Sequence, residues 1–201
     1  MIIVTTTATL LSVTDKPEQL LELAGRTCYK SEDKITPTSA AKFVEMICKR
    51  NHESVLEHAV ATFMFTTDRG ITHELVRHRL CSYSQESTRY VNYHKKGHIR
   101  VVKPLAFKSV ASEASWIRAM VAAESAYNEM IAEGEAPEVA RDVLPTCTAA
   151  DIAVTANFRQ WKHIIKMRTP KAAHPKVRLL IGQAKEILQQ VSPAVFKDTV
   201  E

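Results

Sequence analysis

The order of strand-like and helix-like segments constrains this fold more than any other feature of the sequence. Residues 2–10 and 59–67 are rich in β-branched or alternating apolar residues, which favours strands, and residues 98–102 are a shorter candidate. Amphipathic patterns favour helices over seven further segments: residues 16–29, 39–50, 71–79, 109–133, 137–144, 158–168 and 175–191. The periodicity of residues 149–156 does not distinguish between a helix and a strand. Because these elements do not alternate as regular βαβ units, we predict an α+β fold with long helices and a small antiparallel sheet.

The size and composition of the chain are typical of a single globular domain. Its 201 residues, of which 45% are apolar, predict one domain over residues 1–201 with a buried core. No apolar run approaches the ~20 residues that a membrane helix requires, so we expect no membrane partner. The alternating start MIIVTTTATLLSV lacks a preceding basic region and is typical of a strand rather than a secretory signal. Its four scattered cysteines form no CxxC pair, which favours reduced thiols and a cytoplasmic location.

Two basic segments together carry more than the net charge of +5. Residues 69–100 contain seven Lys or Arg against two acids, and residues 152–185 contain eight Lys or Arg and no acid. Solvated basic faces are a common cause of such runs. The first segment, however, interleaves its cations with the hydroxyl and aromatic residues of SYSQESTRY, and phosphate oxygens accept hydrogen bonds from Arg and hydroxyl groups together. We therefore predict an anion-binding site there.

Arg168 lies on an unexpected face of its predicted helix. At about 100° per residue, it falls on the apolar stripe that Trp161 and Ile165 define. A guanidinium on a buried face is costly unless it meets an anion or a hydrogen-bond acceptor. Alternatively, Arg168 ends the helix and caps its carbonyls or extends to solvent. The spacing alone leaves both interpretations open.

Three other functions, a metal site, a cysteine nucleophile and nucleic-acid binding, have weaker support in the sequence. The run HESVLEH places His52 and His58 six residues apart, so they cannot share a helical face as zinc ligands, and we expect no metal site. Cys81 and Cys147 are candidate nucleophiles if nearby arginines lower the thiol pKa, but small buried side chains explain them more simply. A nucleic-acid-binding module is the non-enzyme alternative, and we expect no nucleic-acid partner.

Four separated blocks resemble the flavin-dependent thymidylate synthase family. The first is Arg77-His78-Arg79, seven residues and then Ser87, within ITHELVRHRLCSYSQESTRY. The second is NFRQWKHIIKMR at residues 157–168, and smaller matches lie at residues 52–54 and 141–145. Together the blocks extend over most of the chain in the family's order.

The resemblance implies an enzyme that converts dUMP to dTMP by reductive methylation. FAD would carry a hydride from NADPH, and 5,10-methylenetetrahydrofolate would supply the carbon. It also implies a homotetramer whose sites take residues from several subunits. The chain has neither a GxGxxG nor a P-loop motif, so FAD would be held in another way.

The resemblance also assigns residues to each ligand. At FAD it places Ser54, Arg77, His78, Arg79, Gln85, Asn157, Phe158, Arg159 and His163. At dUMP it places Glu74, Leu75, Val76, Arg77, Gln85, Glu86, Ser87, Thr88, Arg89, Arg141 and Arg168. The expected catalytic residues are Arg168, Ser87 and His52. Arg168 would assist ionisation of the uracil at N3, because a desolvated cation stabilises a developing anion strongly, and Ser87 would lie near the base without acting as a nucleophile.

Overall fold

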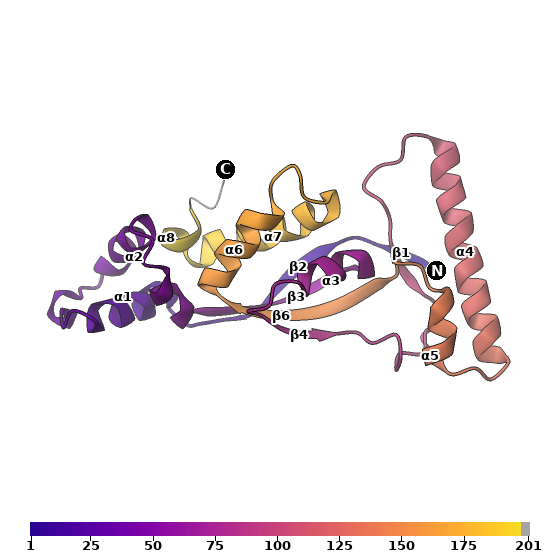
Figure 1. Ribbon diagram of the computed structural model, residues 1–201, viewed down its shortest axis with the longest axis horizontal. Helices are drawn as coiled ribbons and strands as arrows, with labels where there is room; N and C mark the ends of the chain where they lie inside the picture. The colour runs from indigo at the N-terminus through magenta and orange to yellow at the C-terminus, as the bar shows by residue number, and fades with distance from the viewer. Residues whose placement is uncertain (198–201) are drawn as a thin grey trace. The chain divides into compact units, whose positions relative to one another are not determined.

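Two sheets organise the strands of the chain. The computed structural model describes residues 1–197 (Figure 1). One sheet has the strand order β2-β3-β6-β4, and the other pairs β1 with β5. The strands of the larger sheet are β2 (Thr7–Val13), β3 (Val60–Asp68), β6 (Ala149–Asn157) and β4 (Ser82–Gln85). The smaller sheet consists of β1 (Ile2–Val4) and β5 (Arg100–Val102), which run parallel.

β3 and β6 form the antiparallel centre of the larger sheet. Thr62 hydrogen bonds to Thr155, and Thr66 to Asp151, so residue numbers rise along one strand as they fall along the other. Alternate residues of both strands are buried, as expected of strands with one covered face. The open assignment of residues 149–156 is therefore a strand.

The prediction included only an antiparallel sheet, so the parallel pair of β1 and β5 differs from it. Residues 2–10 were expected to form one strand, but the chain leaves regular structure at Thr5 and Thr6 and continues as β2. Its two halves thus join different sheets. Alternation of apolar residues indicates a strand but does not identify its partner, which is why the sequence could not show this division.

Most helices lie where their apolar stripes predict them. They are α1 (Pro17–Thr27), α2 (Ser39–Lys49), α3 (Arg69–Leu75), α4 (Val110–Ala132), α5 (Pro137–Ala140), α6 (Phe158–Arg168), α7 (Pro175–Val191) and α8 (Pro193–Phe196), with 3₁₀ helices η1 (Glu32–Lys34), η2 (Glu53–His58) and η3 (Arg141–Val143). The side chain of Ser109 begins α4 in a capping box with Ser112. Within residues 1–197, no helix combines the length and the apolar character needed to cross a bilayer.

α3 is shorter than its sequence pattern predicts. Asp68 caps its first turn by accepting a hydrogen bond from the Ile71 amide at 2.9 Å, and the helix ends at Leu75. The triplet at residues 77–79, expected at the end of this helix, therefore lies in the connection between α3 and β4. β4 itself forms at residues 82–85, where the sequence pattern predicted no strand.

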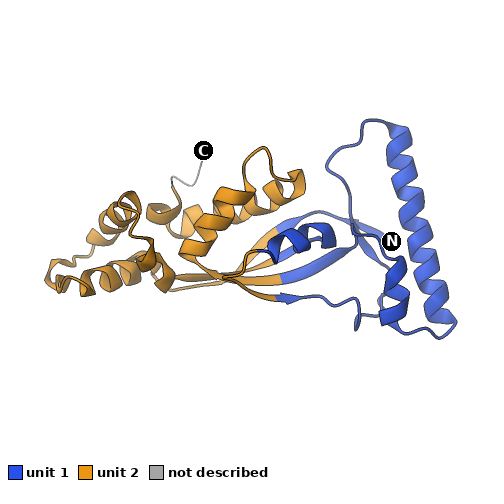
Figure 2. Cartoon of the chain, in the orientation of Figure 1, with its two compact units in different colours: residues 1–7, 65–77, 84–152 blue, residues 8–64, 78–83, 153–201 orange. Residues whose placement is uncertain are grey.

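The described chain divides into two compact units, each built from separate segments (Figure 2). Unit 1 comprises residues 1–7, 65–77 and 84–152 and contains α3, α4 and α5. Unit 2 comprises residues 8–64 and 78–83 and the described residues from Ala153 onward, with α1, α2, α6, α7 and α8. The expectation of one domain over residues 1–201 stays a prediction.

An aromatic core fixes α6 within unit 2, where α6 packs against α7 (Figure 1). Trp161 is fully buried, lies edge to face with Phe63 at 5.1 Å between ring centroids, and donates from Nε1 to the Ala61 carbonyl at 3.1 Å. Phe158 packs in the same way against Phe196, at 5.1 Å. With its apolar stripe buried, α6 presents its polar face outward.

Candidate active site

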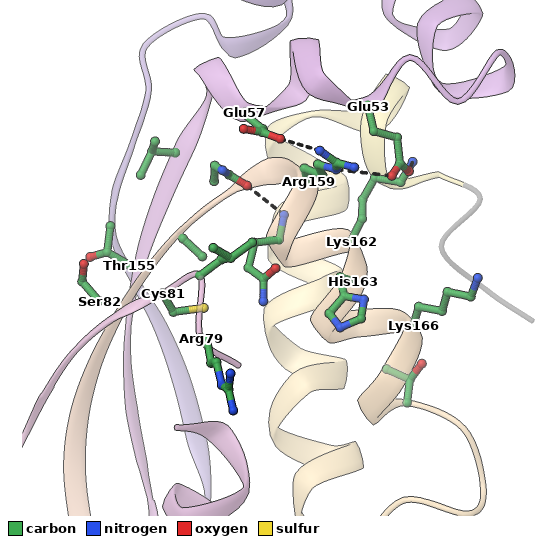
Figure 3. Close-up of a pocket in the computed structure, with 16 residues that line it drawn as sticks. Glu53, Glu57, Arg79, Cys81, Ser82, Thr155, Arg159, Lys162, His163 and Lys166 are labelled. Carbon is green, nitrogen blue, oxygen red and sulfur yellow. Dashed lines mark hydrogen bonds and ion pairs between the residues drawn. The ribbon is translucent and has the colours of Figure 1, made fainter. Parts of the chain in front are cut away.

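A basic cavity of about 1160 Å³ lies in unit 2 (Figure 3). Its wall is built from η2, the residues around the start of β4, the end of β6 and the polar face of α6. Four residues expected at the flavin line it: Arg79, Asn157, Arg159 and His163. The side chain of Asn157 also caps α6 by accepting from the Gln160 amide at 2.8 Å, so this residue fixes the start of the helix as well.

The sequence interpretation missed several residues of the cavity wall. Lys162 and Lys166 lie on the same polar face of α6 as Arg159, and their spacing of three and four residues was a usable signal. The carboxylates of Glu53 and Glu57 enter the cavity from η2, and no pattern in the sequence marked them as partners of α6.

Ion pairs neutralise only part of the cavity's positive charge. Arg159 donates to Glu57 at 2.6 Å and lies 3.7 Å from Glu53, between the two carboxylates in Figure 3. The hydrogen bond to Glu57 raises the pKa of Arg159. Lys162 lies 3.2 Å from Glu53. Within residues 1–197, neither Arg79 nor Lys166 pairs with a carboxylate, so the cavity retains cations that can bind an anion.

The guanidinium of Arg168 meets a hydrogen-bond acceptor within the Arg77-His78-Arg79 triplet. Its Nε donates to Nε2 of His78 at 3.0 Å, and the His78 ring lies edge to face with His163 at 5.8 Å. Burial, together with the positive charges of Arg168 and His163, lowers the pKa of His78 to about 4. His78 is therefore neutral near pH 7 and can accept through Nε2. Of the two interpretations left open for Arg168, the structure supports the one in which the guanidinium meets an acceptor.

Tyr83 and Cys81 support the same region of unit 2. The hydroxyl of Tyr83 donates to the His78 carbonyl at 2.9 Å, which holds the backbone of the triplet. Burial raises the pKa of the Cys81 thiol, although Cys81 lines the cavity. A thiol with a raised pKa is a poor nucleophile at neutral pH, so this environment does not favour Cys81 as a nucleophile.

Some of the expected site residues do not line this cavity. His52, expected to be catalytic, and Ser54, expected at the flavin, are exposed on either side of Glu53, and neither belongs to the wall. The side chain of Phe158 is fully buried against Phe196, so it supports α6 from the core. Among residues 1–197, no group of three or more His, Cys, Asp or Glu side chains is placed to hold a metal ion.

The residues expected at dUMP, apart from Arg168, belong to unit 1 and come from three segments. Residues 74–77 cover the end of α3 and the two residues after it, residues 85–89 begin at the last residue of β4, and Arg141 begins η3. Gln85 donates from Nε2 to Thr72 on α3 at 3.1 Å, and Arg89 forms an ion pair with Glu138 on α5 at 2.8 Å. The segment 85–89 is thus tied to both α3 and α5. Leu75 and Thr88 are buried, whereas Val76, Arg77, Arg89 and Arg141 are exposed.

Ser87 organises a turn rather than a nucleophilic pair. Its hydroxyl accepts from the Arg89 amide at 3.2 Å, and its carbonyl accepts from the amides of Tyr90 and Val91. Among the described residues, no imidazole or carboxylate hydrogen bonds to Ser87, as a base that activates serine would. That Ser87 is not a nucleophile stays a prediction.

Glu86, in contrast, points its carboxylate at residues that the sequence interpretation did not single out. Oε1 accepts from the Tyr93 hydroxyl at 2.8 Å, and Oε2 accepts from Arg100 at 2.7 Å. Arg100 also donates to Asp151 on β6 at 2.9 Å. Arg100 and Asp151 are 51 residues apart in sequence, so no local pattern could have revealed this contact.

Comparison with known proteins identifies the family. Residues 9–194 match the family described as "Thymidylate synthase complementing protein". The flavin-dependent thymidylate synthase of Geobacter sulfurreducens is 35% identical over 196 residues, which cover 94% of this chain and 84% of that protein. The corresponding protein of Mycobacterium tuberculosis is 39% identical over 198 residues, covering 89% and 78%. The chain belongs to the flavin-dependent thymidylate synthase family. The resemblance predicted from the four blocks, and the expectation of an enzyme of this family, are confirmed.

Solved structures show that the fold also resembles that of the flavin-dependent thymidylate synthase family. The chain is similar to a UMP/dUMP methylase, PolB from Streptomyces cacaoi, with a TM-score of 0.85 and 22% identity over 98% of this chain and 96% of that one. It is also similar to thymidylate synthase X from Helicobacter pylori, solved with FAD and dUMP, with a TM-score of 0.80 and 18% identity over 98% and 99%. The predicted mixture of helices with small sheets is confirmed. The roles of individual residues and the homotetramer stay predictions.

Proposed function

We propose that this chain catalyses the reductive methylation of dUMP to dTMP. FAD is the redox cofactor, NADPH the reductant and 5,10-methylenetetrahydrofolate the carbon donor, with tetrahydrofolate as the second product. The observation that carries the proposal is the hydrogen bond between His78 and Arg168, since it joins the two main family blocks next to residues that line a basic cavity.

The cavity of unit 2 suits FAD. Arg79 and Lys166 offer positive charge to a pyrophosphate, and Ser82 and Thr155 add hydroxyl groups. Val60, Leu80 and Ala156 give the wall an apolar part, which suits a planar ring. When bound, FAD would supply the hydride for reduction of the transferred carbon.

Unit 1 supplies most of the groups proposed for dUMP. Arg77, Arg89 and Arg141 are exposed cations that can bind the phosphate. The ion pair of Arg89 with Glu138 is half exposed, so exchanging this carboxylate for a phosphate costs little. Arg168, oriented by neutral His78, stabilises the negative charge that develops at uracil N3.

We further propose that residues 1–201 act as one catalytic domain in a cytoplasmic homotetramer. Its sites share residues from several subunits, and neither nucleic acid nor a membrane is a partner. The residues expected at each ligand come from separate segments of the chain and from both units, which is compatible with sites assembled from more than one subunit.

An absorbance spectrum of the purified chain tests the proposed function. We expect a yellow protein, or one that becomes yellow with added FAD, together with NADPH oxidation and dTMP formation that both depend on dUMP. A colourless protein that neither takes up FAD nor oxidises NADPH in the presence of dUMP would overturn the proposal. Polynucleotide binding with a steep salt dependence would instead support the nucleic-acid alternative.

A further inference from the structure

A polar cluster of five side chains anchors Glu86 inside unit 1. It consists of Thr66 on β3, Glu86 after β4, Tyr93, Arg100 on β5 and Asp151 on β6. Arg100 donates from Nη2 to both carboxylates, at 2.7 Å to Glu86 and 2.9 Å to Asp151. Thr66 donates to Asp151 at 2.6 Å. The cluster therefore connects the segment after β4 with three strands.

Both oxygens of the Glu86 carboxylate are already hydrogen bonded. The Tyr93 hydroxyl binds Oε1 at 2.8 Å, while Arg100 binds Oε2, to which the Asp151 amide lies at 3.3 Å. The backbone is held as well, since the Glu86 amide donates to the Asp151 carbonyl at 2.8 Å and its carbonyl accepts from Arg69 at 3.3 Å. A residue fixed in this way has little capacity left to bind a ligand directly.

Arg100 is the member on which the cluster depends. It lies between two carboxylates, and removing it would leave two like charges close together and part-buried. Burial alone would lower the pKa of Arg100, but hydrogen bonds and charges from Asp151 and Glu86 raise it. Burial likewise opposes the charge on Asp151, yet hydrogen bonds from Arg100 and Thr66 hold its pKa below the ordinary value. The pairing thus favours the charged form of both partners.

We propose that Arg100 is a positioning residue that locks Glu86 as the anchor of segment 85–89, and that Glu86 does not itself contact the nucleotide. This inference rests on the proposed function, because it assigns that segment to dUMP. The neighbours of Glu86 make the geometry useful. Gln85 is tied to Thr72 on α3, and Ser87 begins the next turn, so fixing Glu86 sets the backbone from which Ser87 and Arg89 reach the ligand.

Substitution of Arg100 tests the inference in the full-length chain. We expect Arg100→Met to weaken dUMP binding about tenfold, which corresponds to ~1.4 kcal/mol, while FAD binding changes less than about twofold. Arg100→Lys should recover part of the affinity, because an ammonium keeps the charge but not the forked geometry. Lys103→Met is the matched control, since Lys103 pairs with Glu113 in the same unit and joins no described member of the cluster. Calorimetry with dUMP and flavin absorbance measure the two affinities.

A double-mutant cycle separates an anchoring role of Glu86 from direct contact with the nucleotide. If Glu86 acts through Arg100, Glu86→Gln adds little to the loss of affinity already caused by Arg100→Met. Fully additive losses would mean that Glu86 binds dUMP independently, and would overturn the inference. Amide hydrogen exchange should also become faster in residues 84–91 of Arg100→Met and not in the Lys103→Met control.

Tyr93→Phe keeps the test decisive should Arg100→Met fail to fold. It removes only the hydroxyl that binds Glu86 Oε1, and we expect it to weaken dUMP binding by about threefold or more with FAD unaffected. Unchanged dUMP affinity in both Tyr93→Phe and Arg100→Lys, with a wild type that binds dUMP, would overturn this inference alone. A wild type that binds no dUMP would overturn the proposed function and the inference together.

Discussion

The neutral state of His78 can be tested through the pH dependence of stability. His78 is 8% exposed, its carbonyl is held by Tyr83, and its ring faces Arg168 and His163. Its pKa falls from 6.5 to about 4 in the folded chain, because burial and the two neighbouring cationic groups oppose protonation. At about 1.4 kcal/mol per pKa unit, this shift corresponds to about 3 kcal/mol.

The sign of the effect follows from the proton balance. Between pH 6.5 and about 4 the unfolded chain binds a proton at His78 that the folded chain does not. The contribution of His78 to the free energy of unfolding therefore falls as the pH falls through this window. This contribution levels off below about pH 4, where His78 is protonated in both states. The substitution His78→Gln removes the titration but keeps a side-chain oxygen that can accept from Arg168.

Urea unfolding of the wild type and His78→Gln over this pH range is the assay. The difference between the two curves isolates His78, since the other titrating groups are common to both proteins. We expect the wild type to lose about 3 kcal/mol relative to the variant between pH 7 and pH 4. Parallel curves would refute the reasoning, because they would mean that His78 protonates as readily as in the unfolded chain and cannot serve as the acceptor for Arg168.

Three further substitutions test separate parts of the proposed site. Arg168→Ala should abolish dTMP formation while FAD absorbance is retained; loss of the flavin as well would mean that its role is misplaced. Lys166→Met should weaken FAD binding by about fivefold or more, as expected for one lost cation at a phosphate, with dUMP binding measured by calorimetry unchanged. Cys81→Ala should keep dTMP formation within about threefold, because its raised pKa argues against a thiolate; complete loss of turnover with FAD still bound would restore the nucleophile hypothesis.

Strong apolar stripes made part of this fold predictable from the sequence. α6 and α7 match their predicted ranges, because each has a buried stripe and a clear first turn, capped by Asn157 or begun by Pro175. The prediction extended α3 to residue 79, but residues 77–79 are charged and do not continue the apolar stripe, so nothing in the local pattern fixed where the helix ends. Its end depends instead on contacts from elsewhere in the chain, such as that of Tyr83 with the His78 carbonyl, which a local pattern does not contain.

The candidate site was predictable where its residues share one helix and not where they join different strands. The spacing of Arg159, His163 and Lys166 places them on one face of α6 whatever the rest of the chain does. The contact of Arg100 with Asp151, in contrast, joins residues 51 apart in sequence, and it exists because β5 and β6 reach the same unit. The family resemblance named Glu86 but could not show that its carboxylate is directed at Arg100.

The distribution of the expected residues over the two units gives Arg168 a distinct position. Most residues assigned to FAD belong to unit 2, whereas those assigned to dUMP belong to unit 1 apart from Arg168. The uracil base must lie next to the flavin for the reaction to occur. At least one residue that binds the nucleotide is therefore expected beside the residues that bind the flavin, whichever subunits supply them. Arg168 meets this requirement because its guanidinium is held by His78, whose neighbours Arg79 and His163 line the cavity proposed for FAD. In the proposed site, Arg168 is thus the dUMP-binding residue that belongs to unit 2, whereas Arg77 and Gln85, which the resemblance assigns to both ligands, belong to unit 1.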